Sequence, residues 1–365
     1  MTVRVLEVLG QSAGGVGRHV AEITSALDGA TGMVVDIAAP ADLRVPMPKE
    51  FVPVPIPSGV KGHVGATIRL RSVVRDGGYE VLHAHGLRAA LDAGVAGRML
   101  GVPVLTTMHN LIRPEYSGRA NTRVFAWLEP VAVRLSARTF VPSHDIARHL
   151  RAAVPRRAGD IEVLHAGTAP APEPARPREA VRSELGVEED QSMIVTVARL
   201  HPQKDLPAML EAVSGIDGAV LAVVGEGPLE SELEDLAKEL GIASRVAFVG
   251  FVDNPADYIA AADVFCLSSV WEAVALAAQE AVMLGIPVVT TDVGGMSELV
   301  ADGESGRLVA PGDAAALRDA LDEVIAHPEL GRKYAHRARE DYGTNFSRDA
   351  VLARLREVYS EYADS

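Results

Sequence analysis

Two glutamates eight residues apart lie in the stretch of sequence with the most evident chemical potential. Glu272 follows the apolar run Val264–Leu267, and Glu280 lies in a run of small and apolar residues that predicts a helix. A carboxylate on such a helix needs a partner, because an unpaired buried charge is costly, and ligand hydroxyls would serve. The N–H groups at the start of this helix would favour an anion. These residues predict a ligand site, with a salt-bridged helix glutamate as the alternative.

Two cations follow an earlier predicted strand. Arg199 and Lys204 lie in the loop after Met193–Val197. Arginine offers a planar fork of donors and lysine a point charge, and this pair suits a diphosphate. The alternative is two ordinary surface cations.

A glycine loop follows the first predicted strand, Val3–Val8. Gly14-Gly-Val-Gly17 places Gly15 and Gly17 where a backbone could approach a phosphate at a helix N-terminus. The glycine spacing does not match the G-x-G-x-x-G dinucleotide fingerprint. A tight turn without ligand is the alternative.

Three histidines lie in or directly after predicted strands. His83 and His85 are two residues apart and therefore share one face of a strand, a spacing that can bind metal. Since neither a cysteine nor an evident third ligand is near, we expect strand-end packing or a ligand-facing role and no zinc. His109 follows Val104–Thr107, and the residues alone leave a structural and a ligand-binding role equally open.

The elements that must position these groups alternate between strands and helices, which predicts βαβ units and parallel sheets. Helices are predicted at 18–27, 87–100 and 121–136, and Val52–Pro57 with its prolines predicts a loop or an edge strand. The remaining predicted strands are 33–38, 81–84, 139–141, 219–224, 246–249 and 288–291.

The proline-rich stretch 166–177 marks a domain boundary. We predict an α/β fold of two Rossmann-like doubly wound domains, residues 1–170 and 171–345, facing a central cleft. The segment 346–365 contains a helix, Arg348–Tyr362, predicted to pack back toward the first domain. Closure of the domains about this junction would exclude water from the reaction.

Taken together, these motifs resemble those of retaining glycosyltransferase family 4, which has the GT-B fold. The resemblance rests on the E-x7-E pair Glu272 and Glu280, on Ala198-Arg-Leu-x-x-Gln-Lys204, on Gly225-Glu-Gly-Pro and on Gly14-Gly-Val-Gly-Arg-His19. It covers nearly the whole chain. It implies that the second domain binds a nucleotide-sugar donor and the first mainly the acceptor.

The resemblance also implies roles for single residues. Arg199 and Lys204 would neutralise the donor diphosphate, Glu280 would hold the ribose, and Glu272 would contact the sugar or its phosphate side. His109 would lie near the transferred sugar. The other donor-binding residues implied are Gly15, Gly17, Phe251, Val252, Val274, Ala275 and Leu276.

The implied reaction is transfer of a sugar to an acceptor hydroxyl by a front-face mechanism, in which the departing phosphate oxygen takes the acceptor proton. No metal or other cofactor is expected, because cations and helix dipoles would stabilise the leaving diphosphate. One departure bears on activity: the family's Glu-Gly-Phe-Gly-Leu is here Glu272-Ala-Val-Ala-Leu276. Alanine would be strained at positive φ. The alternatives are a weakly active or inactive nucleotide-sugar-binding protein and another GT-B enzyme, such as a nucleotide-sugar epimerase.

Composition excludes several protein classes. The 365 residues are 48% hydrophobic and 23% charged, and this composition excludes a disordered chain. The single cysteine excludes a disulfide framework. No apolar run approaches the ~20 residues of a membrane span, and no signal peptide is evident, so we expect a cytoplasmic protein.

The net charge of −14 is unevenly divided, with +5 in residues 1–170 and −19 in 171–365. Nine arginines face three acids between Arg113 and Arg157. This basic region predicts either a solvated helical face or peripheral contact with an acceptor or the inner membrane surface. The acidic chain and its 4% aromatic content disfavour nucleic acid as a partner. The acceptor class stays open among small molecules, glycans and lipid-linked sugars.

Overall fold

The chain divides into two units. A computed structural model describes residues 2–10, 15–29, 32–43, 47–57, 61–111, 119–166 and 173–364, without the side chains of 119–126. Unit 1 comprises Met1–Gly167 and Arg348–Ser365, and unit 2 comprises Thr168–Ser347. Residues 167–172 of the predicted proline-rich linker lie outside the described residues, as does Gly14 of the predicted glycine loop.

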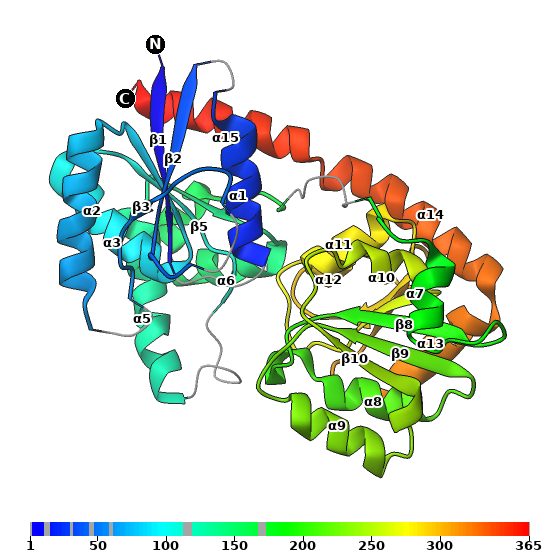
Figure 1. The fold of residues 1–365 in the computed structure, drawn as a ribbon. Coiled ribbons are helices and arrows are strands. Elements are labelled where there is room, and N and C mark those ends of the chain that lie inside the picture. The colour runs from blue at the N-terminus through cyan, green and yellow to red at the C-terminus, as the bar shows by residue number, and fades with distance from the viewer. Residues whose placement is uncertain are drawn as a thin grey trace. The chain divides into compact units, whose positions relative to one another are not determined.

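Unit 1 is built on a seven-stranded parallel sheet (Figure 1). Its order is β3 (Val52–Pro53), β2 (Met33–Ala39), β1 (Val3–Leu9), β4 (Val81–His85), β5 (Val104–Thr107), β6 (Arg138–Val141) and β7 (Ile161–Val163). The surrounding helices are α1 (Gly15–Leu27), α2 (His63–Gly77), α3 (Leu87–Leu100), α5 (Arg119–Leu135), α6 (His144–Ala153) and α15 (Arg348–Ala363). Strand order reverses between β1 and β4, the switch point where doubly wound sheets bind ligands.

Unit 2 repeats this architecture with six parallel strands. Their order is β10 (Val246–Gly250), β9 (Ala219–Val224), β8 (Ser192–Val197), β11 (Val264–Leu267), β12 (Val288–Thr291) and β13 (Arg307–Val309). The helices are α7 (Arg178–Glu184), α8 (Leu206–Ser214), α9 (Glu230–Glu239), α10 (Ala256–Ala261), α11 (Leu276–Met283), α12 (Met296–Leu299), α13 (Ala314–Ala326) and α14 (Pro328–Asn345). Here the order reverses between β8 and β11.

Alternation along the central strands divides the core of unit 2 into two layers. Met193 and Val195 of β8 belong to the cluster that includes Ala278 of α11. Ile194, between them, belongs to the cluster that includes Met209 of α8. Successive side chains of a strand point to opposite faces, so both faces of the sheet are covered by helices. The predicted doubly wound architecture is confirmed in each unit.

The last helix, α15, is fastened to unit 1 by charge and by apolar packing. Arg354 donates to both carboxylate oxygens of Glu162, at 2.7 and 2.9 Å. Leu355 and Val358 pack in one apolar cluster with Val5 of β1. The bidentate pair fixes the position of the helix, while the buried side chains supply most of the stabilisation.

The predicted elements differ from the structure at a few ends. Helix α1 begins at Gly15 rather than at residue 18, because its first turn is formed by the glycines that had suggested a loop. Strands β7 and β13 were not predicted, because each has only three residues and lies at a sheet edge. Val52–Pro53 is an edge strand, where a proline is tolerated. None of the helices described has the length and apolar character that crossing a bilayer requires.

Candidate functional site

Lys204 and Glu272 come together at the switch point of the unit 2 sheet. The Lys204 ammonium pairs with Glu272 Oε1, and Ser269 Oγ donates to the same oxygen at 2.6 Å. Lys204 follows β8 and Glu272 follows β11, the adjacent strands between which the order reverses. Lys204 and Glu272, both predicted to contact the donor, therefore form one charge pair, and Ser269 is a partner that the sequence analysis did not identify.

The two loops that carry this pair are joined by further hydrogen bonds. Ser268 Oγ donates to the Lys204 carbonyl at 2.9 Å. The Val270 N–H donates to the Gln203 carbonyl, and Gln203 Nε2 donates to the Trp271 carbonyl, both at 2.9 Å. Because backbone groups make these contacts, the loops hold their charged side chains in place before any ligand binds.

Asp205 and Gly294 give the site an unusual backbone. Asp205, directly after Lys204, has φ 44° and is the one described residue other than glycine with positive φ. That conformation costs roughly 1–2 kcal/mol for a residue with a Cβ. Gly294 has φ 57°, and a Cβ there would overlap the Glu272 carbonyl oxygen. Strained or glycine-dependent backbone of this kind concentrates at functional sites.

Arg199 is exposed in a loop braced by the Gly225-Glu-Gly-Pro segment. Leu200 N–H donates to the Glu226 carbonyl at 3.0 Å, and a Cβ on Gly225 would overlap the Ala198 carbonyl oxygen. Burial, then the charges of Arg199 and Lys204, lower the pKa of the neighbouring His201. The loop therefore has a positive field although one of its cations is paired.

Glu280 lies on α11, whose N-terminus follows Glu272 by four residues. Glu280 is 2% exposed, and Val274 and Ala275 before the helix are also buried. Ala275 has φ −64°, so alanine in place of the family's glycine is not strained. Ala273 is likewise absent from the positive-φ positions of the described chain. Leu276 is the first residue of α11.

Phe251 and Val252 lie just beyond the end of β10. The Phe251 side chain is 70% exposed, whereas Val252 packs against the apolar core beside α11. An exposed aromatic ring at a strand end is available to stack on a planar ligand. The structure thus leaves the predicted base-contacting phenylalanine accessible within unit 2.

In unit 1, His109 lies beside the first turns of α1. The rings of His109 and His19 meet edge-on with centroids 5.6 Å apart. Gly15 is exposed at the start of the helix and Gly17 is buried in its first turn. The helix N-terminus and the predicted histidine therefore occupy the same end of the unit 1 sheet.

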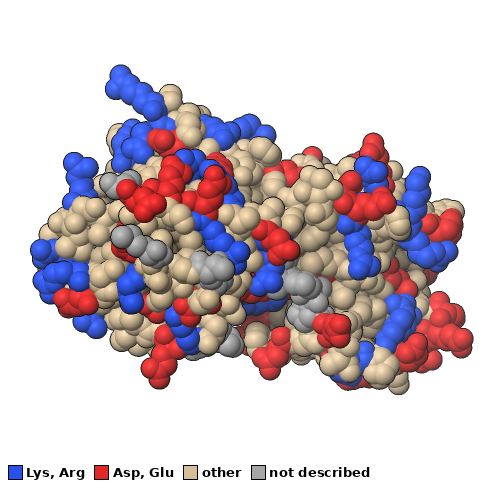
Figure 2. All heavy atoms as spheres, turned by 90° about the horizontal axis from the view of Figure 1, so that it is seen from above, with Lys and Arg blue, Asp and Glu red and all other residues tan. Residues whose placement is uncertain are grey.

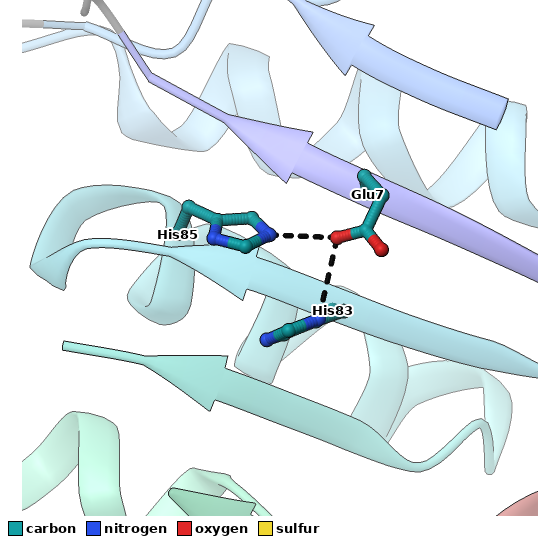
Figure 3. A group of neighbouring side chains, drawn as sticks. All are labelled: Glu7, His83 and His85. Atoms are coloured by element: carbon teal, nitrogen blue, oxygen red, sulfur yellow. Dashed lines mark hydrogen bonds and ion pairs between the residues drawn. The ribbon is translucent and has the colours of Figure 1, made fainter. Parts of the chain in front are cut away.

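His83 and His85 have a third partner that the sequence analysis missed. Glu7 of β1 is fully buried, and its Oε2 lies 2.7 Å from His85 Nε2 and 3.3 Å from His83 Nδ1 (Figure 3). The absence of a third ligand was therefore a wrong premise. Tyr359 Oη also donates to Glu7, at 2.8 Å, so the groups are paired with one another as a hydrogen-bond network. A glutamate amid the apolar residues of β1 was the available signal.

Two hollows found among the described residues lie apart from the Lys204–Glu272 pair. A cavity of about 10 Å³ beside His19, His83 and Thr107 has room for about one water molecule. A hollow of about 470 Å³ lies beside the edge strand β13, and no predicted site residue lines it. The candidate site is therefore defined by its paired charges and strand ends.

Comparison with known proteins finds a glycosyltransferase family match for each unit. The family described as "Glycosyltransferase Family 4" matches residues 13–171, and "Glycosyl transferases group 1" matches residues 177–341. The 2-deoxystreptamine N-acetyl-D-glucosaminyltransferase of Streptomyces fradiae is 32% identical over 290 residues, which is 75% of this chain and 69% of that protein. The putative glycosyltransferase EpsD of Bacillus subtilis is 28% identical, over 91% of this chain and 90% of EpsD.

The fold is also that of a solved structure. HepE from Anabaena, crystallised with UDP and glucose, superposes with a TM-score of 0.84 at 22% identity, over 97% of this chain and 99% of that one.

Proposed function

The chain belongs to the group 1 and family 4 glycosyltransferases, and we propose that its donor is a nucleoside-diphosphate sugar. The observation that carries this proposal is the Lys204–Glu272 pair at the switch point of unit 2. We propose that the sugar passes to an acceptor hydroxyl with retention of its anomeric configuration. HepE was crystallised with UDP, which supports the same class of donor here.

Each unit 2 residue has a role in this proposal. The diphosphate approaches Lys204 and Arg199, while Glu280 accepts hydrogen bonds from ribose hydroxyls and Phe251 stacks on the base. Glu272 holds the Lys204 ammonium in place until a phosphate competes for it. The start of α11 adds N–H groups with partial positive charge.

The reaction needs stabilisation of the leaving diphosphate above all. In a front-face transfer the phosphate oxygen that departs from the sugar takes the proton of the acceptor hydroxyl. Positioned cations and N–H groups stabilise that developing charge without reorganising. We propose that no metal is required, and that His109 of unit 1 contacts the transferred sugar.

Glu280 offers the direct test of donor binding. Replacing Glu280 by Ala should raise the Kd for the nucleoside diphosphate roughly tenfold, because about 1.4 kcal/mol of hydrogen bonding is lost. Isothermal titration measures Kd, and Glu232→Ala on the exposed face of α9 is the control. Unchanged affinity in Glu280→Ala would remove the ribose role.

Activity separates the enzyme from the alternative of an inactive binding protein. A thermal-shift screen against nucleotide sugars identifies the donor, since a ligand of the folded state raises Tm. Turnover of that donor with an acceptor supports the transferase. Binding without turnover or donor hydrolysis contradicts it.

We also propose a peripheral membrane contact, on a surface that shares only α5 with the predicted basic region. Arg113 lies outside the described residues, and several arginines of 113–157 are engaged: Arg138 with Glu162, and Arg157 with Asp160 and the Ser136 carbonyl. They therefore do not form one free cationic face.

The outer face of α2, α3 and α5 is better suited to a bilayer. Of seven large apolar side chains exposed among the described residues, six lie on these helices: Val64, Ile68, Val95, Met99, Trp127 and Val131. Exposed Arg69, Arg98 and Arg134 lie among them, whereas the one exposed acid described on these helices, Asp76, pairs with Arg75. Figure 2 shows blue side chains gathered at the edge of unit 1 where α2 lies.

Anionic lipid is the partner that this chemistry fits. Tryptophan and aliphatic side chains enter the headgroup boundary while arginines bind phosphate. Vesicles with anionic lipid should float the protein, and neutral vesicles should not. The triple variant Ile68→Ser, Trp127→Ser and Arg98→Glu should stay unbound, and Arg332→Glu with Lys333→Glu on α14 should bind normally. Equal flotation by both vesicles, or a dimer covering this face in light scattering, contradicts the proposal. Cytoplasmic location stays a prediction.

A further inference from the structure

Hydrogen bonds link Glu7 to His109 through the interior of unit 1. Glu7, His85 and His109 come from the neighbouring strands β1 and β4 and from the residue pair after β5. The parallel register sets Glu7 opposite His83 and Leu9 opposite His85. Glu7 is 0% exposed, His85 4% and His109 7%. Figure 3 shows the two histidines turned toward the carboxylate.

The Glu7 carboxylate is surrounded by donors. Tyr359 Oη donates to Oε1 at 2.8 Å, and burial and the Glu7 charge raise the pKa of that phenol, which therefore keeps its proton. Burial alone would raise the pKa of Glu7, but attraction to His83 and hydrogen bonds from His83 and His85 lower it well below its usual range. An ionised carboxylate only accepts hydrogen bonds, so His85 Nε2, at 2.7 Å, must carry a hydrogen.

The hydrogen on His85 Nε2 in turn decides which nitrogen of His109 carries a hydrogen. Burial, then the charge of His83, lower the pKa of His85, so its ring is neutral and has a single N–H. That hydrogen is on Nε2, which leaves Nδ1 as an acceptor. His109 Nε2 lies 3.0 Å from His85 Nδ1 and must donate to it. Burial and the neighbouring histidines also lower the pKa of His109, so its own Nδ1 carries no hydrogen.

The other groups against His109 agree with this assignment. Burial above all lowers the pKa of His19 to about 3, so its ring adds no positive charge. His83 is engaged elsewhere: its Nδ1 lies 2.6 Å from Tyr359 Oη and its Nε2 lies 2.7 Å from Thr107 Oγ1. His85 is therefore the described partner that decides the tautomer of His109.

We propose that Glu7 is a positioning residue which, through His85, fixes His109 in the tautomer with an unprotonated Nδ1, ready to accept a hydrogen bond from a sugar or acceptor hydroxyl. This inference rests on the proposed function for the identity of the hydroxyl, and the tautomer itself does not depend on it. No covalent bond changes in this step.

Nitrogen-15 spectra of histidine-labelled protein test the tautomer directly, because protonated and unprotonated ring nitrogens have well-separated shifts. The unaltered protein should show His109 as one tautomer with hydrogen on Nε2. Glu7→Gln has one acceptor oxygen in place of two and cannot satisfy Tyr359 on one side and both histidines on the other. We expect mixed His109 tautomers, and a fall in kcat of roughly 10- to 100-fold with KM nearly unchanged.

Two further variants keep the test decisive. His85→Phe removes the acceptor for His109 and one donor to Glu7, but keeps the Glu7 carboxylate and its bond from Tyr359, and should also mix the tautomers if Glu7→Gln fails to fold. Tyr359→Phe removes a hydrogen bond to Glu7 on the side away from His85, and should keep the single His109 tautomer. One unchanged tautomer in both Glu7→Gln and His85→Phe overturns the proposal. A tautomer change in a protein that transfers no sugar would instead contradict the proposed function alone.

Discussion

The two candidate regions lie at the switch points of similar sheets but are built in opposite ways. In unit 1, Glu7, His83 and His85 lie on the strands themselves and are at most 4% exposed. In unit 2, Arg199, Lys204 and Glu272 lie on loops beyond the strand ends, and the Arg199 side chain is exposed. The first region completes its hydrogen bonds internally, whereas the second keeps positive charge available to a ligand.

This difference separates two tasks of one enzyme. A buried network is rigid and selects a protonation state, because each donor must meet an acceptor away from water. A loop pair at the carboxyl ends of the strands can exchange a carboxylate for a phosphate, while Ser269 still donates a hydrogen bond to the buried Glu272. The comparison therefore predicts that changes in unit 2 affect ligand binding and turnover, and that changes in unit 1 affect protonation and stability.

The largest effect tests whether the backbone around Glu272 is as rigid as the unit 1 network. Gly294→Ala should lower the free energy of unfolding by about 3 kcal/mol, because positive φ and overlap with the Glu272 carbonyl act together. Gly312→Ala is the matched control, with φ +78° and nothing within 4 Å, and should cost about 1 kcal/mol. Urea denaturation measures both. Equal losses would show that the loop relaxes around the added methyl group.

A smaller effect is expected from removing Lys204, the cation proposed to leave Glu272 for the donor phosphate. Lys204→Ala should lower kcat about 100-fold, or about 2.7 kcal/mol, because a donor to the leaving diphosphate is lost. Lys238→Ala removes an exposed lysine that pairs with Asp235 in the same unit, and should leave kcat unchanged. Initial rates at saturating donor make the comparison. Full activity of Lys204→Ala would refute the unit 2 site.

The smallest expected effect is the loss of folding stability that low pH causes through His19 in unit 1. The pKa of His19 is 6.5 in the unfolded reference and about 3 in the fold. A lowered pKa contributes stability above pH 6.5 that is lost as pH falls toward 3, because the unfolded chain binds the proton first. Between pH 7 and pH 5 this loss is about 2 kcal/mol.

His19→Gln should therefore lose about 2 kcal/mol less stability than the unaltered protein over that interval. His336→Gln, on the exposed face of α14, should lose as much as the unaltered protein. Denaturation at the two pH values provides the measurement. Parallel losses in all three proteins would mean that His19 takes up its proton without unfolding.

Much of the fold follows from local pattern. Apolar runs such as Ala219–Val224 and Val264–Leu267 are strands with the predicted bounds, because a strand buried on both faces is apolar throughout. The three-residue strands β7 and β13 escaped prediction because each is short, lies at a sheet edge and contains a charged residue, Glu162 or Arg307, that pairs with a charge on another element. The predicted helix began three residues later than α1 does, because glycines can form the start of a helix as well as a turn.

The site divides in the same manner. Arg199, Lys204 and Glu272 could be predicted because each directly follows a recognisable strand, and parallel strands end at one edge. Tyr359 could not be assigned as a partner, since nothing local distinguishes a hydroxyl that will meet a distant group. Glu7 was marked only by its place in an apolar strand, and the contact of Ser269 with Glu272, three residues on, depends on the conformation of their loop. For Ala273 and Ala275, only the backbone angles could resolve whether they were strained.

Sequence alone determined that the longer apolar segments become strands and which charged residues follow them, because these depend on neighbours within a few residues. Tertiary structure alone decided that Glu7 faces His83 and His85 across 76 and 78 residues, and that Tyr359 reaches Glu7 from the far end of the chain. The reason is physical: sheet register and helix docking set those distances, and a buried proton's position depends on every donor and acceptor around it.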